Sequence, residues 1–199
     1  MAQSAVVPMN QVEAVKTKKQ RDQVEAHLQQ AGRIYYDIWK LGLNTALRIS
    51  DLLALTMADV KRLDAKAPVL DLKEIKTGKS RRIVINKTAL KIMQQRLADF
   101  PKAKYLFESE AVNIDRRRKQ PISRRSVARV LEKIGQRVAP KVQLSTHSMR
   151  KTRGYAMFEA GKSIESICKV LNHSTPAVTM RYIGIDQRDI DQSYHEFEL

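Results

Sequence analysis

Residues 171–184 read Leu-Asn-His-Ser-Thr-Pro-Ala-Val-Thr-Met-Arg-Tyr-Ile-Gly, and this stretch predicts where one helix ends and another begins. Asn172 occupies a helix-end position, where a left-handed backbone is common and asparagine is the best residue after glycine. Thr175 followed by Pro176 is a favourable N-cap and first helical residue. Gly184 predicts the end of that second helix, because glycine adopts the left-handed conformation easily. The C-terminal part of the chain is therefore expected to be helical.

Helical spacing of apolar residues extends this expectation over most of the chain. Trp39 is expected in the core, and Cys168, on an apolar helical face, is expected to be a small buried hydrophobe. The predicted helices cover 11–47, a short segment capped by Ser50, 88–97 capped by Thr88, a segment from Ser123 to about 138, a segment after His147, and 164–171.

Two short runs near the middle of the chain are of β type. They cover 69–72 and 82–85, and the polar segment Lys76-Thr77-Gly78-Lys79-Ser80 lies between them. This pattern predicts a β-hairpin with a basic tip. A phosphate-binding P-loop is excluded, because position 73 is lysine where that motif needs glycine, and no helix follows. The expected fold class is α+β, mainly α, with a small antiparallel sheet.

The composition narrows the class of protein. The chain has 199 residues, with 37 Lys and Arg against 21 Asp and Glu, which gives a formal charge of +16. No run approaches the ~18 apolar residues of a membrane span, and the first residues lack a secretory signal. A single cysteine excludes an internal disulfide and a cysteine-rich zinc site. We expect a cytoplasmic protein with a polyanionic partner and no membrane or small-molecule ligand.

The basic residues gather in four clusters, which makes a double-stranded DNA surface a better interpretation than four separate solvated faces. Aromatic residues are only 6% of the chain, so a base-stacking surface for single strands is poorly supported. The residues expected to contact DNA are Lys79, Arg81, Arg82, Arg124, Arg125, Lys151 and Arg153.

A second, dispersed set of residues suits phosphoryl transfer on DNA without a metal or another cofactor. The set is Arg48, Lys76, His147, Arg150, His173 and Tyr182. Guanidinium groups can hold both non-bridging oxygens of a phosphate and stabilise the charge of its transition state. A lysine can protonate the leaving oxygen, and a phenol can attack phosphorus.

In order and spacing, this set resembles the catalytic domain of the tyrosine recombinases, the phage integrase family. The matching segments are Arg48-Ile49-Ser50-Asp51, Lys76, His147-Ser148-Met149-Arg150, Leu171-Asn172-His173-Ser174 and Tyr182, nine residues after His173. Asp51 stands where the family usually has glutamate, and Asn172 where glycine is common. The matched stretch covers most of the chain, and its size is similar to that of the fimbrial inversion recombinases.

The resemblance implies a site-specific recombinase that cleaves and rejoins DNA through a 3′-phosphotyrosyl intermediate, without metal or ATP. Tyr182 would be the nucleophile, Arg48 and Arg150 would bind the phosphate, and Lys76 would protonate the leaving 5′-oxygen. His147 would assist removal of the phenol proton, and His173 would donate to a phosphate oxygen. Lys79 is an alternative to Lys76, because a mobile hairpin could present either.

The resemblance also bears on domains and assembly. Residues 1–185 would form the catalytic domain, without the separate N-terminal DNA-binding domain of many family members. The acidic tail 186–199 could dock on a neighbouring protomer or cover its own active site. A homotetramer on DNA and an accessory protein are expected partners. A non-catalytic DNA-binding accessory or regulatory protein remains an alternative. So does an enzyme that hydrolyses phosphodiesters or relaxes DNA in the manner of a type IB topoisomerase.

Overall fold

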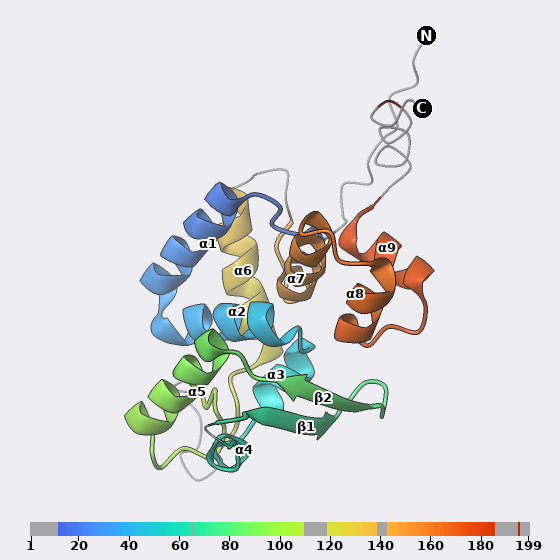
Figure 1. The fold of residues 1–199 in the computed structure, drawn as a ribbon. Helices are drawn as coiled ribbons and strands as arrows, with labels where there is room; N and C mark the ends of the chain where they lie inside the picture. The colour runs from blue at the N-terminus through green and yellow to red at the C-terminus, as the bar shows by residue number, and fades with distance from the viewer. Residues whose placement is uncertain (1–11, 65, 110–118, 139–142, 186–194, 196–199) are drawn as a thin grey trace.

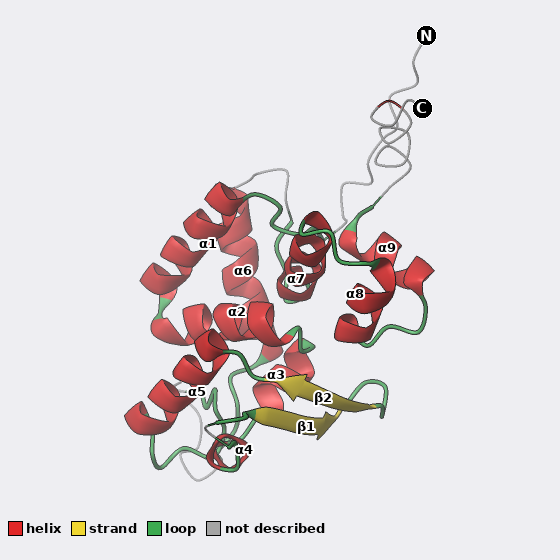
Figure 2. Ribbon diagram, viewed as in Figure 1, coloured by secondary structure: helices red, strands yellow, loops and turns green. Residues whose placement is uncertain are grey.

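The structure is a computed structural model, and it describes residues 12–64, 66–109, 119–138, 143–185 and His195. In chain order its elements are α1 (Lys18–Ala31), α2 (Arg33–Thr45), α3 (Ile49–Ala54), α4 (Met57–Lys61), β1 (Val69–Lys73), β2 (Ser80–Val84), α5 (Lys87–Asp99), α6 (Arg124–Val138), α7 (Ser148–Glu159), α8 (Ile164–Leu171) and α9 (Pro176–Ile183). The described part is mainly helical with one two-stranded antiparallel sheet, which confirms the expected fold class (Figure 2).

The helices form one main body and one smaller unit beside it. Helix α2 packs against α1, α5 and α7, and α1 also packs against α6. Helices α8 and α9 pack on each other and on α7. The β-hairpin lies below this smaller unit, and its turn extends to the same side as α8 and α9 (Figure 1). Residues far apart in the sequence therefore meet between the hairpin, α3, α7 and the α8–α9 pair.

The main core is built around the fully buried Trp39, as the sequence predicts. A second, smaller apolar cluster joins Ala46, Ile167, Leu171 and Ile183, at the junction of α2, α8 and α9. Gly154 of α7 permits this junction, because a Cβ added there would come within 2.6 Å of the Ile183 side chain. The close approach of α7 to α9 therefore depends on the missing side chain.

The hairpin alternates buried and exposed residues along β2, as expected for a strand with one face on the core. Its register pairs Val69 with Val84 and Lys73 with Ser80, so both strands are longer towards the turn than the sequence suggested. Ile83 is buried and Arg82 is exposed. Arg81, on the face of Ile83, is also buried, and this position matters for the site described below.

Several predicted boundaries need correction. Helix α1 begins only after Thr17, whose hydroxyl caps it, and Gly32, with φ of 135°, separates α1 from α2. Helix α5 is capped by Asn86 rather than Thr88, because the Asn86 amide oxygen accepts the Ala89 N–H at 2.9 Å.

Helix α3 begins at Ile49, so Ser50 lies within its first turn and Arg48 is the N-cap. The C-terminal predictions are confirmed: Ile164–Leu171 is helical, and Thr175 caps α9. Asn172 and Gly184 end α8 and α9 in the left-handed conformation. The tail 186–199 lies outside the described residues, apart from His195.

Candidate functional site

Three aromatic side chains meet where α7 begins and α9 ends. The Tyr182 hydroxyl, in the last turn of α9, lies 3.3 Å from Nδ1 of His147, which is the N-cap residue of α7. His173, in the loop between α8 and α9, contacts the Tyr182 ring edge to face, with ring centroids 4.8 Å apart. The two histidines therefore flank the phenol, although 25 residues of helix and loop lie between them in sequence.

Opposing influences act on the pKa of Tyr182. Burial raises this pKa, because the phenolate is the charged form, while the positive charges of Arg150 and Arg48 lower it. The net shift is upward. The Lys151 ammonium also lies over the phenol ring, 5.2 Å from its centroid. The site thus surrounds the hydroxyl with cations that would stabilise the phenolate or a bound anion.

Both histidines are held in the neutral form. Burial is the largest cause, and neighbouring cations act in the same direction. The pKa of His173 falls to about 4, and its Nδ1 lies 3.1 Å from the Thr179 hydroxyl. The pKa of His147 is also lowered. A neutral imidazole beside a phenol can accept its proton.

Arg150 enters the site from α7 and is almost fully buried, at 2% exposed. Its Nη1 donates to the carbonyl of Ala46, and its Nη2 donates to the carbonyl of Leu171 at 2.6 Å. Ala46 has φ of 51° and ends α2 in the left-handed conformation, which turns its carbonyl towards the arginine. These two bonds use part of a guanidinium that has five N–H donors. They fix its plane while leaving donors for an anion.

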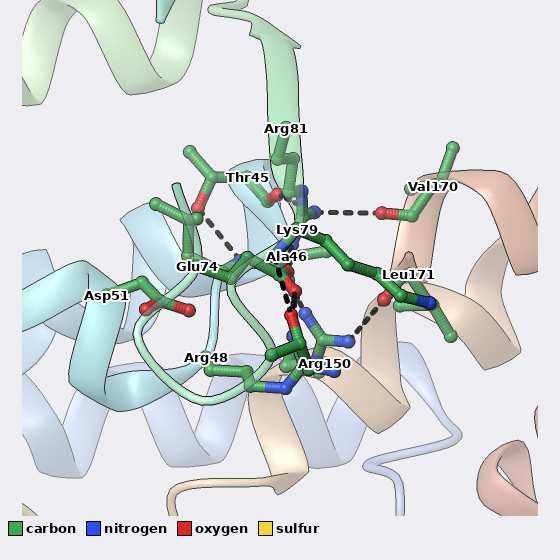
Figure 3. A network of polar contacts seen from close by, with 12 residues as sticks. Thr45, Ala46, Arg48, Asp51, Glu74, Lys79, Arg81, Arg150, Val170 and Leu171 are labelled. Carbon is green, nitrogen blue, oxygen red and sulfur yellow. Dashed lines mark hydrogen bonds and ion pairs between the residues drawn. The ribbon is translucent and has the colours of Figure 1, made fainter. Parts of the chain in front are cut away.

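Arg48 approaches from the start of α3. Its Nη1 lies 2.5 Å from Oε2 of Glu74, a residue just after β1, and 15% of the Arg48 side chain is exposed. Asp51, one turn further along α3, accepts the Ile75 N–H at 2.8 Å and is itself buried. The helix that carries Arg48 is therefore tied to the hairpin (Figure 3).

Both candidate lysines are exposed residues of the hairpin turn. Lys76 lies close enough to His147 to lower the pKa of that imidazole. The Lys79 carbonyl accepts the Glu74 N–H at 2.9 Å, and the Lys79 side chain extends towards Leu171 in Figure 3. The electrostatic influence of Lys76 on the pKa of His147 favours Lys76 as the lysine of the site, as the sequence order does.

The residues expected to contact DNA fall into different surroundings. Lys79, Arg82, Arg124 and Arg125 are exposed, while Lys151 and Arg153 are half-buried. Arg124 and Lys151 lie near enough to His147 to affect its pKa. Arg82 and Arg153 line a groove of about 330 Å³ together with Lys169, which sequence reasoning did not single out.

Arg81 does not suit the role expected of it. Its side chain is 6% exposed and bonds to the carbonyls of Ala46, Thr45 and Val170, and to Oε1 of Glu74 at 3.2 Å. Burial lowers its pKa to about 10. These bonds occupy the guanidinium inside the protein, so we replace the expected DNA contact with a structural role for Arg81.

Glu74 was missed in the sequence because it has no place in the recognised pattern. A signal was present, however. Leu70, Leu72 and Glu74 alternate along β1 and the residue after it, and Arg81, Ile83 and Ile85 alternate along β2 and the residue after it. A charged residue in each inward-facing series indicates a buried ion pair.

Within the described ranges, no group of three or more His, Cys, Asp or Glu side chains is arranged to hold a metal ion. No helix among the described residues is long and apolar enough to cross a membrane.

This fold, with two histidines and two arginines around one tyrosine, defines the catalytic domain of the tyrosine recombinase class. The sequence profile of the phage integrase family matches residues 9–188, and the chain belongs to that family. It is 33% identical to a probable integrase/recombinase, YoeC, of Bacillus subtilis (strain 168), over 95% of this chain and 98% of that protein.

More distant relatives are longer than this chain. It is 26% identical to tyrosine recombinase XerC of Staphylococcus saprophyticus, over 79% of this chain and 51% of XerC. Among solved structures, XerA recombinase superposes with a TM-score of 0.70 at 16% identity, over 96% of this chain and 66% of that one. The Tn1549 transposon integrase, in complex with circular intermediate DNA, superposes with a TM-score of 0.68 at 20% identity, covering 96% and 68%. The chain thus spans about half of XerC and about two thirds of these two structures.

Proposed function

We propose that this protein is a site-specific recombinase that cleaves and rejoins double-stranded DNA through a phosphotyrosyl intermediate. The observation that carries this proposal is the 3.3 Å separation of the Tyr182 hydroxyl and Nδ1 of His147, with Arg150 beside the phenol. Membership of the phage integrase family supports the same reaction, and several structurally similar proteins are described in complex with DNA.

In the first step, the Tyr182 oxygen forms a bond to the scissile phosphorus as the bond from phosphorus to the 5′-oxygen breaks. The phenol proton passes to neutral His147, and Lys76 donates a proton to the departing 5′-oxygen. Arg48 and Arg150 bind the non-bridging oxygens, where charge develops in the transition state. A 5′-hydroxyl of a partner strand then attacks the phosphotyrosine and reverses these transfers, which conserves the bond energy.

His173 has a separate role in this proposal. The Thr179 hydroxyl lies 3.1 Å from Nδ1 of His173 and 3.3 Å from the Thr175 carbonyl, so its one proton has two acceptors. In this proposal it donates to Nδ1, which leaves the imidazole proton on Nε2, where it can donate to a phosphate oxygen. The lowered pKa of His173 keeps the imidazole in its neutral form. DNA binding itself would come from the exposed Lys79, Arg82, Arg124 and Arg125 and the half-buried Lys151 and Arg153 of the predicted set.

The assembly belongs to the same proposal. A homotetramer on DNA would bring together the strands that exchange, and an accessory protein could supply DNA contacts beyond those of residues 12–185. The tail 186–199 is the segment proposed to join protomers. Deleting the residues after Asp186 should weaken assembly on DNA if the tail docks on a neighbour, and should raise single-site cleavage if it covers its own site.

Covalent trapping tests the reaction. The protein is incubated with genomic DNA fragments carrying random nicks, because a nick beside the scissile phosphate releases a short piece and strands the phosphotyrosine. Adducts are isolated by denaturing gel and the captured DNA is sequenced. Tyr182→Phe should abolish the adduct while retaining DNA binding, and Tyr105→Phe, a matched change elsewhere, should leave it intact.

Other outcomes separate the alternatives. An adduct that persists in Tyr182→Phe would remove this tyrosine as the nucleophile. Retardation of DNA by the wild-type protein without any adduct would favour a binding-only accessory protein. Relaxation of a supercoiled plasmid without strand exchange would favour a topoisomerase-like reaction.

A further inference from the structure

Glu74 is the buried carboxylate at the centre of the polar network in Figure 3. Its side chain is 0% exposed, although it lies just after β1, where the chain enters the turn. A carboxylate in such a place needs strong compensation, because burying an unpaired charge is costly. The structure supplies that compensation from three directions.

Two hydrogen-bond donors and one ion-paired guanidinium surround the carboxylate. Oε2 lies 2.5 Å from Arg48 and accepts the Thr77 hydroxyl at 2.7 Å, and Oε1 accepts from Arg81 at 3.2 Å. Burial raises the pKa of Glu74. The Thr77 hydrogen bond and the charges of Arg48 and Arg81 together lower this pKa by more than burial raises it, so the net shift is downward. Glu74 is therefore ionised in the folded protein.

Two cations share this one negative charge. If Arg48 were its only partner, Glu74 would cancel the positive charge that a phosphate needs. Arg81 supplies a second guanidinium, so the group of Arg48, Glu74 and Arg81 keeps a net charge of +1. Arg81 is in turn fixed by the carbonyls of Thr45, Ala46 and Val170. The ion pair can thus orient Arg48 without neutralising the site.

The same carboxylate shapes the turn that carries Lys76. The Thr77 hydroxyl that donates to Glu74 also accepts the Lys79 N–H at 3.4 Å. The main chain of Glu74 closes the turn as well, since its carbonyl accepts the Gly78 N–H at 2.8 Å and its N–H donates to Lys79. Lys76 lies inside this closed turn, one residue from Thr77.

We propose that Glu74 is a positioning residue that couples Arg48 to the turn carrying Lys76 through the hydroxyl of Thr77. The carboxylate makes both contacts through Oε2: the Arg48 arm orients the arginine that binds phosphate, and the Thr77 arm holds the turn so that the lysine faces the leaving oxygen. This inference rests on the proposed function, because it assigns the geometry of its phosphate-binding and proton-donating groups. Displacing a reacting group by ~1 Å can slow a reaction about 10²-fold.

The leaving-group atom provides the test of the Thr77 arm. Two nicked substrates carry the captured DNA site, one with the natural 5′-oxygen at the scissile bond and one with sulfur in its place. A thiolate leaves readily without a proton, because thiol pKa values lie near 8.5. The wild-type protein must form the adduct on both substrates. Lys76→Ala should be slowed about 10²-fold or more on oxygen and little on sulfur.

Thr77→Val removes the hydroxyl from an exposed residue and should leave the fold intact. It should slow cleavage about tenfold on the oxygen substrate and less than twofold on sulfur, since only proton donation is disturbed. Thr77→Ser, which keeps the hydroxyl, should restore the rate. Thr88→Val, at an exposed threonine of α5, is the matched control and should behave as wild type.

Glu74→Gln tests both arms together. Because Arg48 acts on both substrates, this change should slow cleavage of both the oxygen and the sulfur substrate. The oxygen substrate should be slowed more, because proton donation is disturbed as well. Equal slowing of both substrates by Thr77→Val, or no slowing by it, would overturn the proposal even if Glu74→Gln fails to fold. Failure of the wild-type protein to form any adduct would instead overturn the proposed function.

Discussion

Gly154→Ala tests whether the packing of α7 on α9 sets the position of Tyr182. A Cβ at this position would lie 2.6 Å from Cγ2 of Ile183 and 3.1 Å from Cδ1 of Leu171. Carbon atoms in contact are normally about 3.5–4.0 Å apart, so α9 must move outward by about 1 Å. Ile183 directly follows Tyr182, and the phenol would move with it.

Two magnitudes follow from this displacement. Overpacking a core position destabilises a protein by about 1–3 kcal/mol. A shift of ~1 Å at the nucleophile slows the chemical step about 10²-fold. Gly154→Ala should therefore unfold at lower denaturant concentration and form the covalent adduct about 10²-fold more slowly. Stability is measured by chemical denaturation, and the rate of adduct formation by single-turnover cleavage of a nicked substrate. Both measurements are made at a temperature where the variant is folded.

Gly161→Ala is the matched control. Gly161 has φ of +72° and no atom within 4 Å of an added Cβ, so alanine would cost about 1–2 kcal/mol through its backbone alone. The control should lose similar stability but keep its cleavage rate. If Gly154→Ala cleaved as fast as Gly161→Ala, the packing of α7 on α9 would not set the position of the nucleophile.

Three further outcomes are expected. Arg81→Met should lower the free energy of unfolding by about 3–5 kcal/mol, because it leaves a buried carboxylate with one partner fewer. The control Arg82→Met, on the exposed face of β2, should change the free energy of unfolding by less than about 0.5 kcal/mol. Equal effects of the two changes in urea denaturation would contradict the structural role of Arg81. Burial lowers the pKa of His173 to about 4, so the unfolded chain binds a proton that the folded one does not as pH falls below about 6.5. Stability should therefore fall between about pH 6.5 and 4, and His173→Gln should make that decline shallower in unfolding curves; an unchanged slope would contradict the lowered pKa. Arg124→Ala should reduce the log–log salt slope of DNA binding by ~0.9 per lost phosphate contact, and an unchanged slope in gel retardation would remove Arg124 from the DNA surface.

Local signals predicted much of the fold. Thr175, Pro176 and Gly184 placed α9, and Asn172 placed the end of α8, because caps and left-handed ends depend on a few adjacent residues. The predicted start of α5 was wrong because two neighbouring residues are both suitable N-caps. Asn86 and Thr88 can both cap a helix, and the choice depends on where the hairpin delivers the chain.

The candidate site was predicted by order and spacing rather than by position in space. His147, Arg150, His173 and Tyr182 do come together, and Arg48 lies within electrostatic reach of the phenol. The sequence pattern did not include the buried residues that support this site. The pattern did not include Glu74. Arg81 was assigned to the DNA surface because the basic run in the sequence does not show which of its residues face the core and which face solvent.

The sequence by itself determined the helical class, the hairpin, the set of candidate site residues and the sign of the net charge. These depend on residue type and on spacing along the chain. Only the tertiary structure decided which cations face solvent and which are bound by carbonyls, because the Ala46, Val170 and Leu171 carbonyls come from the ends of helices far apart in sequence. Burial then set the electrostatics, since a charge taken out of water is governed by its partners rather than by its own type.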